Sequence, residues 1–139
     1  CTIGVDVMVG FPGETEKHFN DTYDLLNDLP VSYFHVFPFS EREDTLAADM
    51  DGTIKLDIRY ARAKILRKLS KIKFQKTHED SMGIVRPVLF EMVDDKNISG
   101  LTDNYIRVQA QMSNQTKINN ITNVKLLDSN SGVMMGNIL

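Results

Sequence analysis

The first 39 residues constrain the fold most, because strand, turn, helix and strand signals follow one another directly. Residues 2–9 alternate Ile and Val with small or polar residues, which is the period-two pattern of a strand. Glycines at 10 and 13 break this pattern, and apolar residues then recur at helical spacing as far as Pro30. Residues 32–39 are aromatic and β-branched, which favours a second strand. Together these segments predict a βαβ unit with parallel strands.

Composition limits the class of protein and the kinds of site. Hydrophobic residues make up 42% of the sequence and charged residues 25%, which is typical of a soluble globular chain. The lone cysteine excludes an internal disulfide and favours a reducing, cytoplasmic location, and with three histidines it argues against a closed structural zinc site. The sequence has no initiator Met and opens inside the first predicted strand, so we expect it to be a segment of a longer protein.

Functional residues of a βαβ unit gather where its parallel strands end. The first end carries Gly10, Gly13 and Glu14. Glycines let a ligand approach the backbone, the following helix N-terminus favours negative groups, and Glu14 could accept a hydrogen bond from a polar ligand. The alternative is a tight turn without a ligand, and the spacing alone favours that alternative.

Three further polar residues have two interpretations each. Asp6 shares a strand face with Gly4 and Met8 that is predicted to point inward, as a structural hydrogen-bonding group or as a substrate contact. His35 alternates with aromatic residues, which favours a packed histidine over a ligand. Arg42 follows the second strand, and it either pairs with a neighbouring acid such as Glu41 or binds a carboxylate or phosphate through its planar guanidinium.

A long amphipathic helix is predicted from about residue 55 to about residue 79. Its predicted buried stripe consists of apolar residues three or four positions apart: Ile58, Ala61, Ile65, Leu69 and Ile72. Residues 54–82 carry nine Lys and Arg against three acids, and these basic residues fill the other helix faces. A solvated face and an RNA-facing surface are equally good interpretations of that charge.

Short strand patterns between Gly, Asn and Ser clusters follow Gly83, which predicts a small antiparallel barrel. Tyr105 and Arg107 are expected on one strand face, with Arg86 and Lys125 elsewhere on the barrel. An aromatic residue with arginines suits stacking and phosphate contacts with RNA. This part has five basic and five acidic residues, so its net charge is zero. Composition alone therefore favours an ordinary solvated face over an RNA-binding face.

Two segments carry a resemblance to a known family. Residues 4–15 look like the fifth-strand segment of radical S-adenosylmethionine barrels. Residues 34–45 are similar to the sixth-strand segment of the tRNA methylthiotransferases, in which an aromatic-Ser-x-Arg-x-Gly-Thr pattern recurs. Ser40, Arg42 and Thr45 match that pattern, and Asp44 replaces its glycine.

The resemblance continues to the end of the chain. Residues 100–108 look like part of the TRAM domain, a small RNA-binding barrel that closes these enzymes. The best match is the branch that acts on threonylcarbamoyladenosine beside the anticodon. The implied fold is α+β, with the end of a partial parallel α/β barrel at 1–53, a basic connecting helix at 54–82 and a TRAM barrel at 83–139.

The resemblance also implies a function for the longer protein, which would form 2-methylthioadenosine in tRNA. It would use S-adenosylmethionine and 4Fe-4S clusters, and it would bind its partner tRNA at the anticodon stem-loop. The implied cofactor-pocket residues are Gly10, Glu14, Phe37, Ser40 and Arg42. The implied RNA contacts are Arg86, Tyr105, Arg107 and Lys125. The cluster cysteines are missing from this sequence, so the segment alone is expected to be inactive.

Other interpretations remain open at this point. The chain could be a stand-alone RNA-binding module, or a fragment of another radical S-adenosylmethionine enzyme that shares the glycine turn. No membrane partner is expected. Open strand edges of a partial barrel also suggest self-association.

Overall fold

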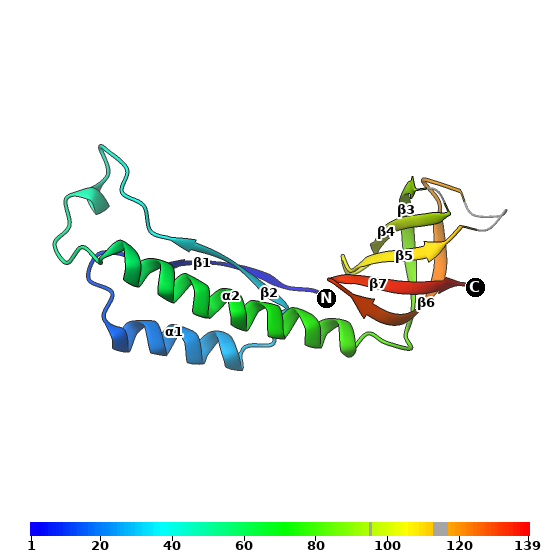
Figure 1. Ribbon diagram of the computed structural model, residues 1–139, viewed down its shortest axis with the longest axis horizontal. Helices are drawn as coiled ribbons and strands as arrows, with labels where there is room; N and C mark the ends of the chain where they lie inside the picture. Colours follow the sequence, from blue (N-terminus) through cyan, green and yellow to red (C-terminus); the bar gives the residue numbers. More distant parts are fainter. Residues whose placement is uncertain (95, 113–116) are drawn as a thin grey trace. The chain divides into compact units, whose positions relative to one another are not determined.

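The computed structural model describes residues 1–94, 96–112 and 117–139. It contains two compact units, residues 3–73 and residues 74–139 with the first two residues. Helices dominate one unit and strands the other, which confirms the predicted α+β class (Figure 1). Within the ranges described, no helix is long and apolar enough to cross a membrane.

The first unit is built on the predicted βαβ arrangement. Its elements are β1 (Gly4–Val9), α1 (Glu16–Asp28), β2 (Tyr33–Pro38), a 3-10 turn (Leu46–Ala48) and most of α2 (Leu56–Glu79). The two strands pair in parallel, with Gly4 opposite Tyr33 and Val9 opposite Pro38. Thr15 caps α1, because its hydroxyl accepts a hydrogen bond from the His18 N–H at 3.2 Å.

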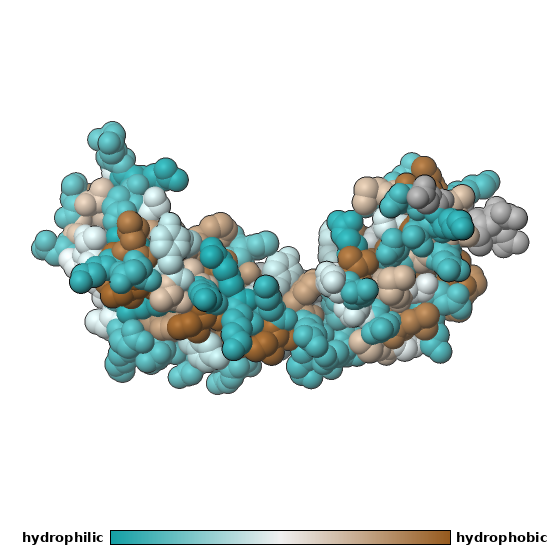
Figure 2. Space-filling view, viewed as in Figure 1, coloured by the Kyte–Doolittle hydropathy of each residue, from teal (hydrophilic) through white to brown (hydrophobic). Residues whose placement is uncertain are grey.

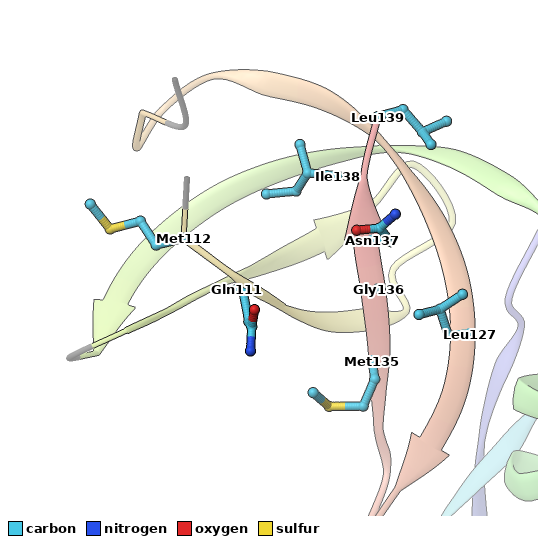
Figure 3. Close-up of a pocket in the computed structure, with 8 residues that line it drawn as sticks. All are labelled: Gln111, Met112, Leu127, Met135, Gly136, Asn137, Ile138 and Leu139. Atoms are coloured by element: carbon cyan, nitrogen blue, oxygen red, sulfur yellow. The ribbon is translucent and has the colours of Figure 1, made fainter. Parts of the chain in front are cut away.

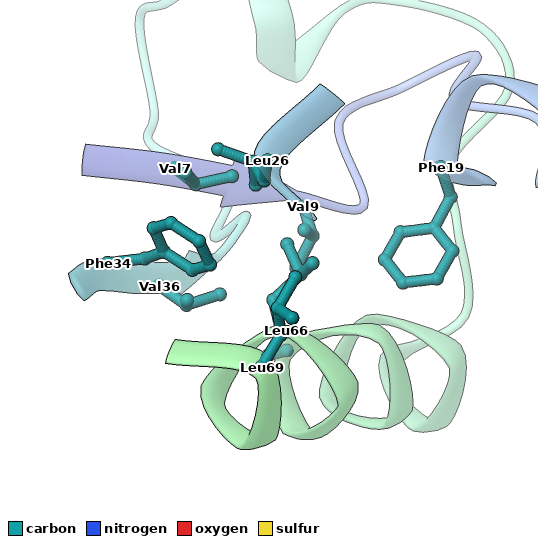
Figure 4. Packing of buried hydrophobic residues seen from close by; sticks show 9 residues of the cluster. Val7, Val9, Phe19, Leu26, Phe34, Val36, Leu66 and Leu69 are labelled. Atoms are coloured by element: carbon teal, nitrogen blue, oxygen red, sulfur yellow. The ribbon is translucent and has the colours of Figure 1, made fainter. Parts of the chain in front are cut away.

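Both helices pack on one face of the two-stranded sheet (Figures 1 and 4). The buried side chains come from all four elements: Val7, Val9, Phe19, Leu26, Phe34, Val36, Ala63, Leu66 and Leu69. On the opposite, free face of the sheet, Asp6, Met8, His35 and Phe37 are exposed. The expectation of a packed His35 is wrong, because its ring lies on this free face beside the ring of Tyr33, 5.2 Å away.

The predicted buried stripe of α2 is wrong except at Leu69, which is buried. Ile58, Ile65 and Ile72 are exposed, and Figure 2 shows hydrophobic patches among the charged side chains over the helices. The buried side runs through Arg59, Arg62, Ala63, Leu66, Leu69 and Ser70. This side fits the sheet because small residues allow close approach, and the Ser70 hydroxyl accepts a hydrogen bond from the Phe34 N–H at 2.8 Å.

The second unit is a closed five-stranded barrel. Its strands are β3 (Val85–Asp94), β4 (Asn97–Thr102), β5 (Arg107–Gln111), β6 (Ile121–Asn130) and β7 (Val133–Ile138), in the order β3-β4-β5-β7-β6. All neighbours are antiparallel except β5 and β7, which are parallel, so the expectation of a fully antiparallel barrel is wrong. The reason is geometric, because strand directions cannot alternate all the way round a ring with an odd number of strands.

Candidate functional site

The turn after β1 is fixed by its first glycine. Gly10 is buried with φ +76°, and a Cβ there would collide with the side chain of Arg59. Its N–H donates a hydrogen bond to Glu14 Oε2 at 2.7 Å. The left-handed backbone and the close approach both require glycine at this position.

Glu14 lies at the centre of a buried network. Its Oε2 also accepts from Arg62 Nη1 at 2.6 Å, and the same nitrogen donates to the Glu14 carbonyl at 3.0 Å. Arg62 Nη2 reaches Glu16 at 3.1 Å, and the guanidinium lies 5.4 Å from the ring of Phe19. The Glu14 carboxylate is therefore already committed to the backbone and to an arginine, which supports the interpretation as a structured turn.

A second arginine holds the segment that follows β2. Arg59 is 2% exposed, and it donates from Nη1 to the Phe39 carbonyl at 2.9 Å and from Nε to the Ile54 carbonyl at 2.7 Å. Its guanidinium also pairs with both oxygens of Glu41, at 3.0 and 2.5 Å. The hydrogen bond from Arg59 lowers the pKa of Glu41 to about 2, and Glu41 in turn raises the pKa of Arg59.

The remaining predicted cofactor residues lie at and beyond the end of β2. Phe37 is exposed on the free sheet face, in register with Met8, and Ser40 and Arg42 are exposed. In the part of the chain that the structure describes, the Arg42 side chain makes no ion pair with any of its expected partners Glu41, Glu43, Asp44 and Asp49, and Glu41 is held by Arg59. Its guanidinium is thus free for a ligand.

Asp44 occupies the place of the glycine in the sixth-strand pattern. It adopts φ +62°, the left-handed conformation that glycine favours and that Asp tolerates better than most residues. Thr45 Oγ1 donates to the Arg42 carbonyl at 2.8 Å across this turn. The substitution therefore keeps the backbone conformation that a glycine would adopt.

The four predicted RNA-contact residues lie on three strands and one turn of the barrel. Tyr105 lies in a turn with φ +64° and not on a strand with Arg107, because Thr102 Oγ1 accepts from the Ile106 N–H at 2.8 Å and closes that turn. Arg86 pairs with Asp103 at 3.3 Å. Arg107 on β5 and Lys125 on β6 are exposed, with β7 between their strands.

Two grooves open on the barrel surface. One, of about 350 Å³, is lined by Tyr105, Leu89 and Ile121 together with the acids Glu91 and Asp103. The other, of about 570 Å³ and called the β5–β7 groove below, lies at the C-terminal ends of the paired strands β5 and β7, where Gln111, Met112, Met135 and Asn137 line it (Figure 3). Among the residues that the structure describes, no group of three or more His, Cys, Asp or Glu could hold a metal ion.

Comparison with known proteins identifies relatives of this chain. No protein-family model matches it. The threonylcarbamoyladenosine tRNA methylthiotransferase MtaB of Aquifex aeolicus is 36% identical over 110 residues, which are 79% of this chain and 26% of that protein. The tRNA-2-methylthio-N(6)-dimethylallyladenosine synthase of Baumannia cicadellinicola is 32% identical over 140 residues, 99% of this chain and 31% of that protein. The chain is related to the tRNA methylthiotransferases.

This relationship confirms the resemblance seen in the sequence. MtaB of Bacillus subtilis adds a match of 34% identity over 127 residues, 88% of this chain and 28% of that protein. The chain thus spans less than a third of the length of these methylthiotransferases, in alignments that cover most of both units.

Sequence reasoning missed Arg59 and Arg62, the residues that organise the strand-end turns of this methylthiotransferase relative. Arginine is mostly exposed in proteins, so the sequence predicts both on the basic, exposed faces of the helix, either solvated or RNA-facing. A signal was nevertheless present, because positions 59, 62, 63, 66, 69 and 70 form one helical stripe once arginine is allowed on it. The groove between β5 and β7 had no comparable signal, since barrel closure determines which strands meet.

Proposed function

We propose that this chain is a segment of a tRNA methylthiotransferase that forms 2-methylthioadenosine in the threonylcarbamoyladenosine branch. Its first unit would supply one wall of the S-adenosylmethionine pocket, and its barrel, a TRAM domain, would bind the tRNA anticodon stem-loop. The observation that supports the proposal is the 36% identity to the threonylcarbamoyladenosine tRNA methylthiotransferase MtaB of Aquifex aeolicus over 79% of the chain.

Exposed and buried residues would have different roles in the cofactor pocket. Phe37, Ser40 and Arg42 have free side chains at one end of the sheet and would contact S-adenosylmethionine directly. Gly10 and Glu14 would act through the backbone, because the Glu14 carboxylate is bound by Arg62 and the Gly10 N–H. When bound, S-adenosylmethionine supplies the radical and methyl-transfer chemistry of the family.

An iron–sulfur cluster does not fit the residues of this chain. Cys1 is its one cysteine and is exposed, and the described residues hold no cluster of potential metal ligands. Cluster ligands would come from other parts of a longer protein. We therefore expect the 139-residue chain to have no methylthiotransferase turnover by itself.

Of the proposed activities, tRNA binding can be measured directly on this chain. The 139-residue chain would be titrated with an anticodon stem-loop RNA, and affinity measured by fluorescence anisotropy at about 50 mM and about 200 mM salt. With about three phosphate contacts, affinity is expected to fall roughly 20- to 40-fold between these concentrations. Absence of binding, or binding that salt does not change, would contradict an RNA-binding role.

Two secondary parts of the proposal concern assembly and location. The two-stranded sheet of the first unit has unpaired strand edges, which favour pairing with further strands or self-association. A tRNA substrate and a lone cysteine favour a cytoplasmic location.

A further inference from the structure

The groove between β5 and β7 has a lining that suits a planar polar ligand. Gln111 and Asn137 come from the two parallel strands, and Figure 3 shows Gln111 and Met135 reaching toward each other across the groove. Met112 and Leu127 extend its apolar part. The groove therefore presents two amides within an apolar surround.

These side chains match the chemistry of a nucleobase. A carboxamide both donates and accepts hydrogen bonds, which is the combination that base edges require. Methionine sulfur makes favourable contacts with aromatic rings, so Met112 and Met135 could contact a base face. Unpaired RNA bases expose both their faces and their edges, whereas bases in a duplex do not.

The β5–β7 groove and the groove around Tyr105 differ in charge. The side chains that line the β5–β7 groove are uncharged, and the terminal carboxylate of Leu139 in the 139-residue chain belongs to a lining residue. Lys125 is the cross-strand neighbour of Asn137 in the β6–β7 pair. A lysine beside the groove can contact the phosphate of a nucleotide whose base lies inside it. The groove around Tyr105 is lined instead by Glu91 and Asp103, which repel a phosphate backbone.

We propose that the β5–β7 groove binds one unpaired RNA nucleobase, with Gln111 and Asn137 on its edge and Lys125 on the adjoining phosphate. This inference rests on the RNA-binding role proposed above and assigns that role to a particular site. It also moves the base-contacting surface away from Tyr105 and Arg86.

The test compares RNA affinities of the 139-residue chain and of two variants. The double variant Gln111→Met and Asn137→Leu removes both amides and preserves side-chain size. Asn20→Leu is the matched control, since Asn20 is an exposed amide on α1. Thermal unfolding verifies that each variant is folded. Each protein is titrated with an anticodon stem-loop RNA and with a fully paired RNA of the same length.

The double variant is expected to bind the stem-loop about tenfold more weakly and the paired RNA with unchanged affinity, while Asn20→Leu binds both as the unmodified chain does. A measurement without substitutions supports this result, because the side-chain amide NMR signals of Gln111 and Asn137 should shift when the stem-loop is added.

Two outcomes would overturn the inference, and only one of them also rejects RNA binding by the chain. Equal stem-loop binding by the double variant and the unmodified chain, with unshifted Gln111 and Asn137 signals, rejects the groove but keeps RNA binding. Absence of binding by the unmodified chain rejects the RNA-binding role together with the groove.

Discussion

At the residue scale, two buried arginines determine the conformation of the turns at the strand ends. Arg59 binds the carbonyls of Phe39 and Ile54, and Arg62 binds the carbonyl and carboxylate of Glu14. Both turns would carry cofactor contacts in the proposed function. The arginines are therefore positioning residues, because Arg59 fixes the backbone from which Ser40 and Arg42 extend and Arg62 fixes the turn at Glu14.

Arg59→Met should destabilise the chain by about 2 kcal/mol, because the Phe39 and Ile54 carbonyls lose a buried donor. Lys64→Met on the exposed side of α2 is the control and should change the free energy of unfolding by less than about 0.5 kcal/mol. Urea unfolding monitored by circular dichroism measures both. Equal changes in the free energy of unfolding for the two substitutions would show that the Arg59 contacts do not stabilise the fold.

The Glu41–Arg59 pair predicts a pH dependence. The Glu41 pKa is lowered from 4.5 to about 2, so its contribution to stability is present above pH 4.5 and is lost as pH falls from 4.5 to about 2. Carbon NMR of the Glu41 carboxyl should give a titration midpoint near pH 2 in the unmodified chain and near 4.5 in Arg59→Met. A midpoint near 4.5 in both proteins would rule out the ion pair in solution.

At the element scale, the sequence predicted which segments form strands and helices far better than which face of a helix is buried. Period-two and helical patterns located β1, α1, β2 and α2, because those patterns follow directly from backbone geometry. α2 carries apolar residues on two faces, and only its partners decide between them. The parallel β5–β7 pair was missed for a similar reason, since it depends on closure of the barrel.

A pair of adjacent residues tests the observed face of α2. Leu66 is fully buried and Ile65 is 46% exposed. Leu66→Ala should destabilise the chain by about 2–4 kcal/mol, because it leaves a cavity against the sheet. Ile65→Ala should change stability by less than about 0.5 kcal/mol. The reverse order in thermal or urea unfolding would support the stripe predicted from sequence.

The last turn of α2 lies in the second unit and carries a buried histidine. His78 Nδ1 is 2.7 Å from Ser129 Oγ, and its ring lies 4.3 Å from that of Phe74. The neighbouring acids Glu79 and Asp80 are exposed and bound to Gln75 and Lys76. Burial lowers the pKa of His78 below 6.5, so the folded state disfavours the protonated form.

Stability should therefore fall as pH drops below about 6.5, because the unfolded chain then binds a proton that folded His78 does not. Unfolding free energies between about pH 5 and 7 should slope upward with pH in the unmodified chain, and less steeply in His78→Gln. Parallel slopes in the two proteins would mean that His78 does not titrate differently on folding.

At the scale of the whole molecule, family resemblance predicted more than physical patterns did. The motif around Ser40, Arg42 and Thr45 identified the methylthiotransferases, and the comparisons confirm that relationship. Charge and periodicity alone did not decide whether the barrel surface binds RNA or is only solvated. They could not locate a binding surface, because the turn conformation of Tyr105 and the ion pair between Arg86 and Asp103 depend on the folded barrel.

In the proposed function, the barrel is the part of this methylthiotransferase relative that contacts tRNA. Amide NMR of the 139-residue chain, recorded while an anticodon stem-loop RNA is added, would locate such contacts residue by residue. Shifted signals are expected to concentrate on β5, β6 and β7, around Gln111, Lys125 and Asn137. Shifts confined to residues 3–73, or a spectrum that the RNA leaves unchanged, would contradict this proposal.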